Sequence, residues 1–248
     1  MNPNLPYIPP DYETIVHHDV RFCFSACEAE GDRKLIKDVS VAALDYVTKA
    51  LAFKPIRQTY VCCYHTRDDA TRALGRNVPA SMAMAPYASE TCGLVVIHSP
   101  SLHPTNQDTR RLRRILAHEL CHLLVAERSA STKILGDDNG NMHVSAWLNE
   151  GLAEVIGFKA IADEHRLTVL SEAFQASQAY HTFGTLSQWL DDLDHDARSQ
   201  AFEHGTGAVE QLCEHLGIEA VFNQICQIDT LFDASNTCSP AQLAQCFG

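Results

Sequence analysis

The sequence predicts an α+β fold, in which a small mixed sheet with helices forms the N-terminal part and helices make up most of the C-terminal part. Three observations support this prediction. Strand-like apolar patterns recur before residue 105. Apolar residues return at helical spacing over residues 112–124, and a helical pattern continues through most of the chain after residue 145. The sequence therefore divides into residues 1–105 and residues 106–248.

The individual elements follow from the same patterns. After a proline-rich leader, strands are expected over residues 19–27, 59–65, 82–85 and 94–98, and helices over residues 31–53 and 68–74. Pro100 then interrupts the strand pattern. In the C-terminal part, helices are expected over residues 145–164, 168–180, 185–193, 197–215, 218–227 and 240–246. Gly217 separates two of these helices as a helix stop.

The composition is that of a globular chain of 248 residues, with 46% hydrophobic and 20% charged residues. A formal net charge of −12 argues against a nucleic-acid-binding surface and against binding to anionic membranes. The first ten residues lack the basic start and apolar core of a signal peptide, and no run is long and apolar enough for a transmembrane helix. A cytoplasmic location is therefore expected, with unconventional secretion and the oligomeric state left open.

The chain contains ten cysteines. Most fall in expected strands or helices, where cysteine acts as a small apolar residue, so free thiols are expected there. This group comprises Cys23, Cys27, Cys62, Cys63, Cys92 and Cys121. Cys238 and Cys246 can form a disulfide in an oxidising compartment, and the sequence leaves that pairing open.

The strongest chemical signal is the segment 118–122, which reads H-E-L-C-H. Positions i and i+4 lie about 40° apart around a helix, so His118 and His122 can direct their imidazole nitrogens at one point. A zinc ion suits that point. Glu119 lies beside it, where a carboxylate can take a proton from metal-bound water. The pattern H-E-x-x-H is a zinc-hydrolase signature, and either Asp108 or Thr109 can cap its helix.

A catalytic zinc site has three protein ligands and one open position, so a third ligand is needed. Residues 123–125 continue the helix and do not supply the third histidine of a metzincin motif. Downstream, residues 147–154 read W-L-N-E-G-L-A-E, which sets Glu150 and Glu154 one helical turn apart. His143, in a loop-like stretch, is an alternative third ligand.

These two segments resemble the H-E-x-x-H and W-L-x-E-G-x-A-E helices of gluzincin metallopeptidases, the clan of thermolysin-like proteases and zinc aminopeptidases. The resemblance implies that His118 and His122 bind Zn²⁺, that Glu150 is the third ligand and that Glu119 is the general base. It gives Glu154 the role of a carboxylate that hydrogen-bonds a ligating histidine and fixes its tautomer.

The resemblance also implies a zincin-like arrangement, with the zinc site between the two parts of the chain. In this clan an extended substrate lies along an edge strand that precedes the zinc helix, a role expected here for residues 92–98.

Relatives stabilise the oxyanion with a tyrosine or histidine, often held in a segment resembling Y-x-x-G-x-x-F/A. Residues 202–208 read F-E-H-G-T-G-A, with phenylalanine in place of tyrosine, so His204 is the first candidate, ahead of Tyr180 and His181.

The expected function is that of a zinc-dependent peptidase acting on a peptide or protein substrate. Zinc aminopeptidases carry a G-x-M-E-N segment on the edge strand, and residues 93–97, G-L-V-V-I, do not match it, which favours an endopeptidase or a narrow-specificity peptidase. Two alternatives stay open. One is a catalytically weak binding or regulatory protein on the same scaffold, supported by the missing tyrosine; the other is a zinc hydrolase of a non-peptide amide or ester.

Overall fold

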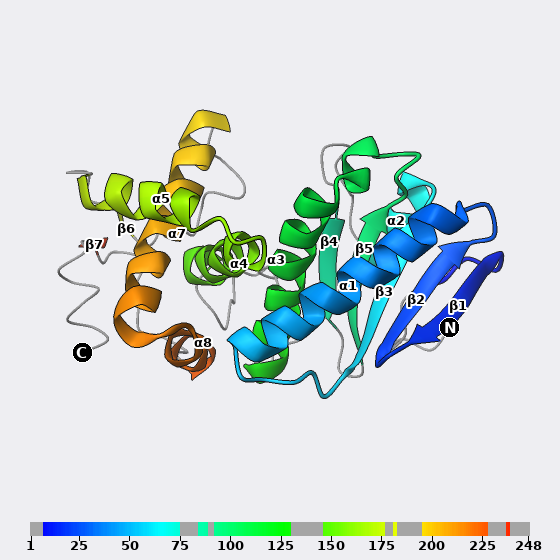
Figure 1. Ribbon diagram of the computed structural model, residues 1–248, viewed down its shortest axis with the longest axis horizontal. Helices are drawn as coiled ribbons and strands as arrows, with labels where there is room; N and C mark the ends of the chain where they lie inside the picture. Colours follow the sequence, from blue (N-terminus) through cyan, green and yellow to red (C-terminus); the bar gives the residue numbers. More distant parts are fainter. Residues whose placement is uncertain are drawn as a thin grey trace. The chain divides into compact units, whose positions relative to one another are not determined.

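The computed structural model describes residues 7–74, 84–88, 92–129, 146–176, 181–182, 195–227 and 237–238. These residues form a mixed α+β protein, which confirms the predicted fold class at that level (Figure 1). The chain divides into two compact units, Met1–Ile134 and Leu135–Gly248. Within the described ranges, no helix is both long and apolar enough to cross a membrane.

The first unit contains a five-stranded sheet with the strand order β1-β2-β3-β5-β4. Strands β2, β3 and β5 are parallel to one another, whereas β1 and β4 run antiparallel to their neighbours. The elements of this unit are β1 (Tyr12–His17), β2 (Val20–Ser25), α1 (Glu30–Ala50), β3 (Gln58–Tyr64), α2 (Arg67–Leu74), β4 (Met84–Ala88), β5 (Cys92–His98), the 3₁₀ helix η1 (Pro104–Gln107) and α3 (Thr109–Arg128).

Most of these elements lie where the sequence predicts them. Strand β1 was not expected, because its segment Y-E-T-I-V-H directly follows the proline-rich leader and lacks a clear apolar alternation. Its backbone groups pair instead with those of the antiparallel strand β2. A tight turn joins the two strands, and His18 in this turn has a positive φ of 49°. Sheet pairing, rather than the local pattern, therefore defines this strand.

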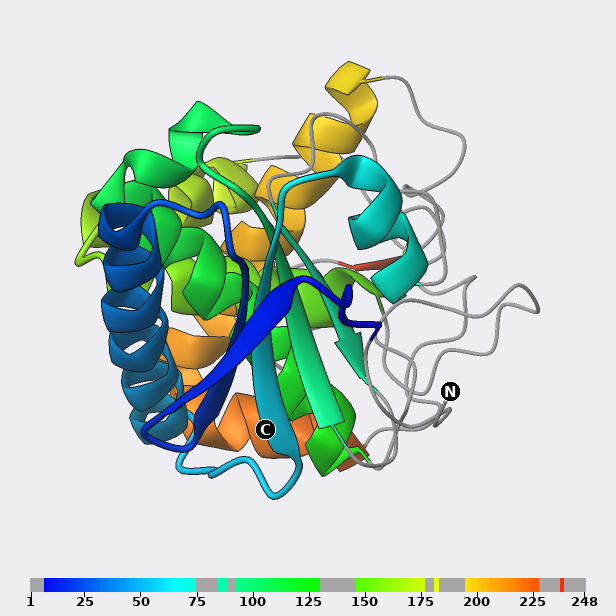
Figure 2. The same cartoon turned by 90° about the vertical axis from the view of Figure 1, so that its right-hand side faces the viewer.

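Both faces of the parallel strands are covered by helices. Leu94 and Val96 of β5 belong to a buried cluster with Ala70 of α2. On the opposite face, Gly93 lies against the side chain of Leu123 in α3. Figure 2 shows α2 on one side of the sheet and α1 and α3 on the other. This coverage explains why all seven residues of β5 are buried and why its sequence is a continuous apolar run.

Two expectations about this region differ from the structure. Residues 92–98 were expected to be an edge strand, but β5 pairs with β3 on one side and with β4 on the other, so this expectation was wrong. In the described sheet the edge strand on this side is β4, which pairs antiparallel with β5. The boundary between the units also follows α3 and does not precede it, since α3 packs against α1, β4 and β5.

The second unit is helical in the parts that the structure describes. Its helices are α4 (Ala146–Ala160), α5 (Glu164–Ala176), α7 (His195–Leu216) and α8 (Ile218–Gln227), and the two-residue strands β6 (His181–Thr182) and β7 (Thr237–Cys238) pair antiparallel. Helix α7 packs against α4, α5 and α8. Gly217 lies between α7 and α8 with φ of 86°, which confirms the predicted helix stop.

Some sequence predictions fall outside the described residues. These are the helices over residues 185–193 and 240–246, the residues His143 and Tyr180, and the thiol Cys246. The six cysteines predicted as free thiols form no disulfide in the described part of the chain, and neither do Cys213 and Cys226.

Glycines permit the closest approaches between helices of the second unit. A Cβ atom on Gly151 of α4 would lie 2.8 Å from the carbonyl oxygen of Gly205 in α7. A Cβ atom on Gly207 would overlap the carbonyl oxygen of Leu170 in α5. The backbone of α7 therefore rests directly on both neighbouring helices.

We expect Gly207→Ala to lower the free energy of unfolding by about 1–3 kcal/mol. The added methyl group would overlap the backbone carbonyl of Leu170, which cannot move aside as a flexible side chain can. Gly31→Ala in α1 is the matched control: no atom lies within 4 Å of its Cβ position, so a change of about 0.5 kcal/mol towards higher stability is expected. Urea denaturation of both variants measures these differences. Equal effects of the two substitutions would contradict the described packing.

Candidate metal centre

Helix α3 is fixed at its start by a side-chain cap. The Asp108 carboxylate accepts hydrogen bonds from the backbone N–H groups of Arg110, at 2.9 Å, and Arg111, at 3.1 Å. These two groups have no partner within the helix, so the cap stabilises the first turn. Of the two capping residues that the sequence left open, the structure therefore selects Asp108. The cap sets where the helix begins and thus which residues face the sheet.

Helix α3 has an apolar side, and its histidine pair lies on a different side of the helix. Leu112, Leu116 and Leu120 are at most 1% exposed, and they recur at the spacing that places them on one side of the helix. His122 is 2% exposed and Glu119 is 8% exposed, whereas His118 is half-buried. Burial of this apolar stripe thus carries three polar side chains into a largely water-excluded position.

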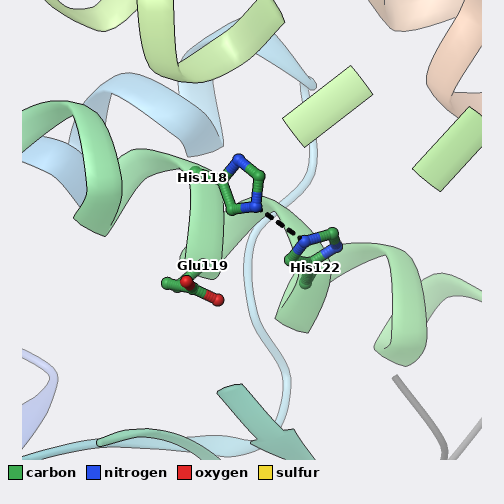
Figure 3. Close-up of side chains that lie close together, drawn as sticks. All are labelled: His118, Glu119 and His122. Carbon is green, nitrogen blue, oxygen red and sulfur yellow. Dashed lines mark hydrogen bonds between the residues drawn. The ribbon is translucent and has the colours of Figure 1, made fainter. Parts of the chain in front are cut away.

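The two imidazoles meet as the helical spacing requires. The Nε2 atoms of His118 and His122 lie 3.0 Å apart, and their rings are nearly perpendicular, at 84° (Figure 3). One candidate ligand atom from each of His118, Glu119 and His122 lies within 4.8 Å of the others. The sequence prediction that these residues form one cluster on one helix is confirmed.

This donor set fits a metal ion. Two nitrogens that each lie about 2.0–2.1 Å from a tetrahedral zinc ion are about 3.3 Å apart, close to the 3.0 Å found between the two Nε2 atoms. At that separation the Nε2–H of one imidazole donates a hydrogen bond to Nε2 of the other. A metal ion bound by both nitrogens would displace that proton. Imidazole is a ligand for zinc and for several other transition metals, so the cluster defines a possible metal site without defining the metal.

The remaining predicted site residues belong to the second unit. Glu150 of α4 is 8% exposed, and Glu154 is half-buried one turn further along the same helix face. Gly151 follows Glu150 and carries the close contact with Gly205 of α7. This contact places the helix with the two carboxylates directly against the helix that contains His204.

His204 itself lies half-buried on α7. Its ring is 6.5 Å from the ring of Phe174 in α5, in an edge-on arrangement. Burial lowers the pKa of His204, which keeps the imidazole neutral at neutral pH. A neutral imidazole has one N–H donor, which is the group that an oxyanion needs. His181, the other described candidate, lies in the short strand β6.

The structure thus brings His118, Glu119 and His122 together in the first unit, and it assigns Glu150, Glu154 and His204 to the second. Sequence reasoning missed the helix contact that links Gly151 to the segment around His204. Each motif has a glycine beside its candidate residue, and a glycine can mark a close approach between helices. A glycine in the sequence does not show which other segment approaches it.

Comparison with known protein families finds no family model that matches the chain, and comparison with curated proteins finds no matching sequence. The fold and the site therefore define the class of protein: a mixed α+β protein with a candidate metal centre on an H-E-x-x-H helix.

We expect Asp108→Ala to lower the free energy of unfolding by about 1 kcal/mol, because two backbone donors at the start of α3 lose their acceptor. Thr109→Ala changes the neighbouring residue, which makes no cap hydrogen bond, and should stay within about 0.5 kcal/mol of the wild type. Chemical denaturation followed by circular dichroism measures both. A larger effect of the Thr109 substitution would contradict the assignment of the cap.

Proposed function

We propose that the protein is a zinc-dependent peptidase of the gluzincin type. Of the two kinds of peptidase in that clan, we propose an endopeptidase in preference to an aminopeptidase. The observation that supports this best is the position of Glu119, a carboxylate only 8% exposed, beside two imidazoles whose Nε2 atoms lie 3.0 Å apart. A purely structural zinc site uses four protein ligands and needs no additional buried carboxylate. A hydrolytic site needs such a carboxylate as a base.

In the proposed reaction, His118 and His122 hold the metal ion, and Glu150 completes the ligand set. A bound zinc ion supplies a Lewis acid and lowers the pKa of a water molecule to near 7. Glu119 accepts the proton of the attacking water and passes it to the leaving amine. His204 donates a hydrogen bond to the oxyanion, and Glu154 fixes the tautomer of a ligating imidazole.

The sheet offers a position for an extended substrate. Strand β4 is the last strand of the described sheet on its side, and α3, which carries the histidine pair, packs against it. An edge strand can add a peptide strand through backbone hydrogen bonds, which bind a main chain regardless of its side chains. We therefore transfer to β4 the substrate role that the sequence had suggested for residues 92–98.

Replacement of Glu119 by Gln should lower the rate at which a peptide library is cleaved by about 10²–10⁴-fold. The amide keeps the shape of the side chain but does not act as a base. Zinc content should stay at the wild-type level. The matched control is Glu127→Gln on the same helix, where the side chain accepts hydrogen bonds from the backbone N–H groups of Ile56 and Arg57. That variant should cleave at the wild-type rate.

The outcomes of this experiment distinguish the proposed peptidase from the two alternative functions. Retained cleavage in Glu119→Gln would overturn the assignment of the base. If the zinc-loaded wild type cleaves no peptide but hydrolyses small amides or esters in a Glu119-dependent way, the site acts on non-peptide substrates. If it binds zinc and hydrolyses neither, the protein is a binding or regulatory member of the same scaffold.

Replacement of Glu150 by Ala should remove a direct ligand and leave less than one zinc per chain after extensive dialysis. Replacement of Glu154 by Ala should weaken zinc binding only about 10–100-fold, because an indirect partner of the metal is lost. Elemental analysis and a competition titration with a chelating dye measure both. Zinc retention in Glu150→Ala equal to that of the wild type would show that Glu150 is not a ligand.

A further inference from the structure

A second group of polar side chains lies at the carboxyl ends of the three parallel strands, away from the H-E-x-x-H segment in the sequence. Glu28 follows β2, His65 follows β3, and Ser99 and Ser101 follow β5. Because parallel strands end at the same edge of a sheet, these four residues meet although they are far apart in the chain. This edge is where open α/β sheets commonly bind their ligands.

The four side chains form a closed ring of contacts. Glu28 Oε2 lies 3.0 Å from His65 Nε2. The other nitrogen of the His65 imidazole, Nδ1, lies 3.4 Å from Ser101 Oγ. Ser99 Oγ donates its single proton to Glu28 Oε1 at 3.1 Å and lies 2.7 Å from Ser101 Oγ, so Ser101 is the donor in that second contact. The Ser101 hydroxyl must therefore turn from Ser99 to His65 Nδ1 before it can react. Ser99 Oγ also accepts the backbone N–H of Ser101 at 3.2 Å, which fixes the turn that presents Ser101.

We propose that Ser101, His65 and Glu28 form a nucleophile–base–carboxylate site that acts on carboxylic esters. A serine becomes a nucleophile when a base lies within hydrogen-bond reach and a third group orients that base. Ser101 supplies the hydroxyl, His65 the base and Glu28 the orienting carboxylate. The site uses no residue of the candidate metal centre and does not depend on the proposed peptidase activity.

The protonation of the imidazole follows from its neighbour. An ionised carboxylate only accepts hydrogen bonds, so contact with Glu28 places the proton of neutral His65 on Nε2 and leaves Nδ1 as the acceptor. The 3.0 Å contact has the length of a hydrogen bond without its alignment, so a rotation of the ring is needed to direct Nε2–H at the carboxylate. Such contacts commonly tighten when a substrate binds.

Burial follows the order that these roles require. The side chain of Glu28 is 1% exposed, that of His65 is 26% exposed, and Ser101 is exposed to solvent. A reagent therefore meets the hydroxyl first and the carboxylate last. Cys63, whose sulfur lies 3.2 Å from Glu28 Oε2, is not the nucleophile, because burial and the nearby carboxylate raise the pKa of its thiol well above the usual range.

The proposed reaction conserves every proton and bond. Ser101 Oγ attacks the ester carbonyl carbon while its proton moves to His65 Nδ1. The bond to the leaving oxygen then breaks, and that oxygen takes the proton from Nδ1. Water attacks the resulting acyl serine by the same path, with His65 again as base, and releases the acid. Esters with phenolic leaving groups suit the site best, because a phenoxide is a weaker base than an alkoxide and needs little stabilisation as it leaves.

A second hydroxyl–imidazole pair nearby provides an internal comparison. Thr105 Oγ1 lies 2.6 Å from His103 Nδ1, a shorter contact than that between Ser101 and His65. No carboxylate contact of His103 is found among the described residues. If a hydroxyl beside an imidazole were sufficient, Thr105 would react as well; if the carboxylate is required, only Ser101 reacts.

The test uses a fluorophosphonate probe on the full-length protein, with the modified residue located by peptide mass spectrometry. In wild type the probe should attach to Ser101 Oγ with loss of fluoride. Ser101→Ala should remove the adduct, and His65→Gln should slow labelling about 100-fold, as expected for loss of a general base. Thr105→Ala should label at the wild-type rate, and so should the wild type after treatment with a metal chelator, which separates this site from the metal centre.

Glu28→Gln and Glu28→Asp test the positioning role. Glu28→Gln should slow labelling of Ser101 by at least about 10-fold, whereas Glu28→Asp, which keeps the carboxylate, should restore part of the rate. Labelling of Glu28→Gln at the wild-type rate would overturn the role of Glu28. No adduct on Ser101 in the wild type, or equal labelling of Thr105, would overturn the proposal itself.

Discussion

Burial of one apolar stripe on α3 determines the position of the candidate metal centre. Leu112, Leu116 and Leu120 pack this helix into the first unit, where it contacts α1, β4 and β5. The histidine pair lies on another side of the same helix, so the packing of the leucines fixes the helix that carries the imidazoles, and no flexible loop holds them. A site on a rigid helix holds its ligand atoms at a fixed separation, which metal binding requires.

The polar side chains of the candidate metal centre are costly to bury. Glu119 and His122 are largely removed from water, and desolvation is unfavourable unless such groups are paired. The contact between the two Nε2 atoms recovers part of this cost. Binding of a cation would recover more, since it gives both imidazoles and the nearby Glu119 an attractive charge.

The sequence predicted this centre well because its geometry is local. The distance between His118 and His122 depends only on the rise and turn of a helix, so five residues suffice to predict that they meet. The helix bounds were also within reach, since Asp108 has a side chain that caps. The strands β2, β3 and β5 followed in the same way from their apolar runs.

The features that the sequence did not predict depend on topology. The order of β4 and β5 did have a local signal, since Pro86 within β4 is typical of an edge strand and the continuous apolar run of β5 is typical of an inner strand. The contact of Gly151 with Gly205 joins two helices that are about fifty residues apart in sequence. The group formed by Glu28, His65, Ser99 and Ser101 likewise exists only because three parallel strands end at one edge.

The most direct test of the central claim is the X-ray absorption spectrum of the full-length protein loaded with one equivalent of zinc. We predict two imidazole nitrogen ligands at about 2.0–2.1 Å, lost together when both His118 and His122 are replaced by alanine. A spectrum with sulfur ligands at about 2.3 Å, or one unchanged in the double variant, would place the metal elsewhere and contradict the account.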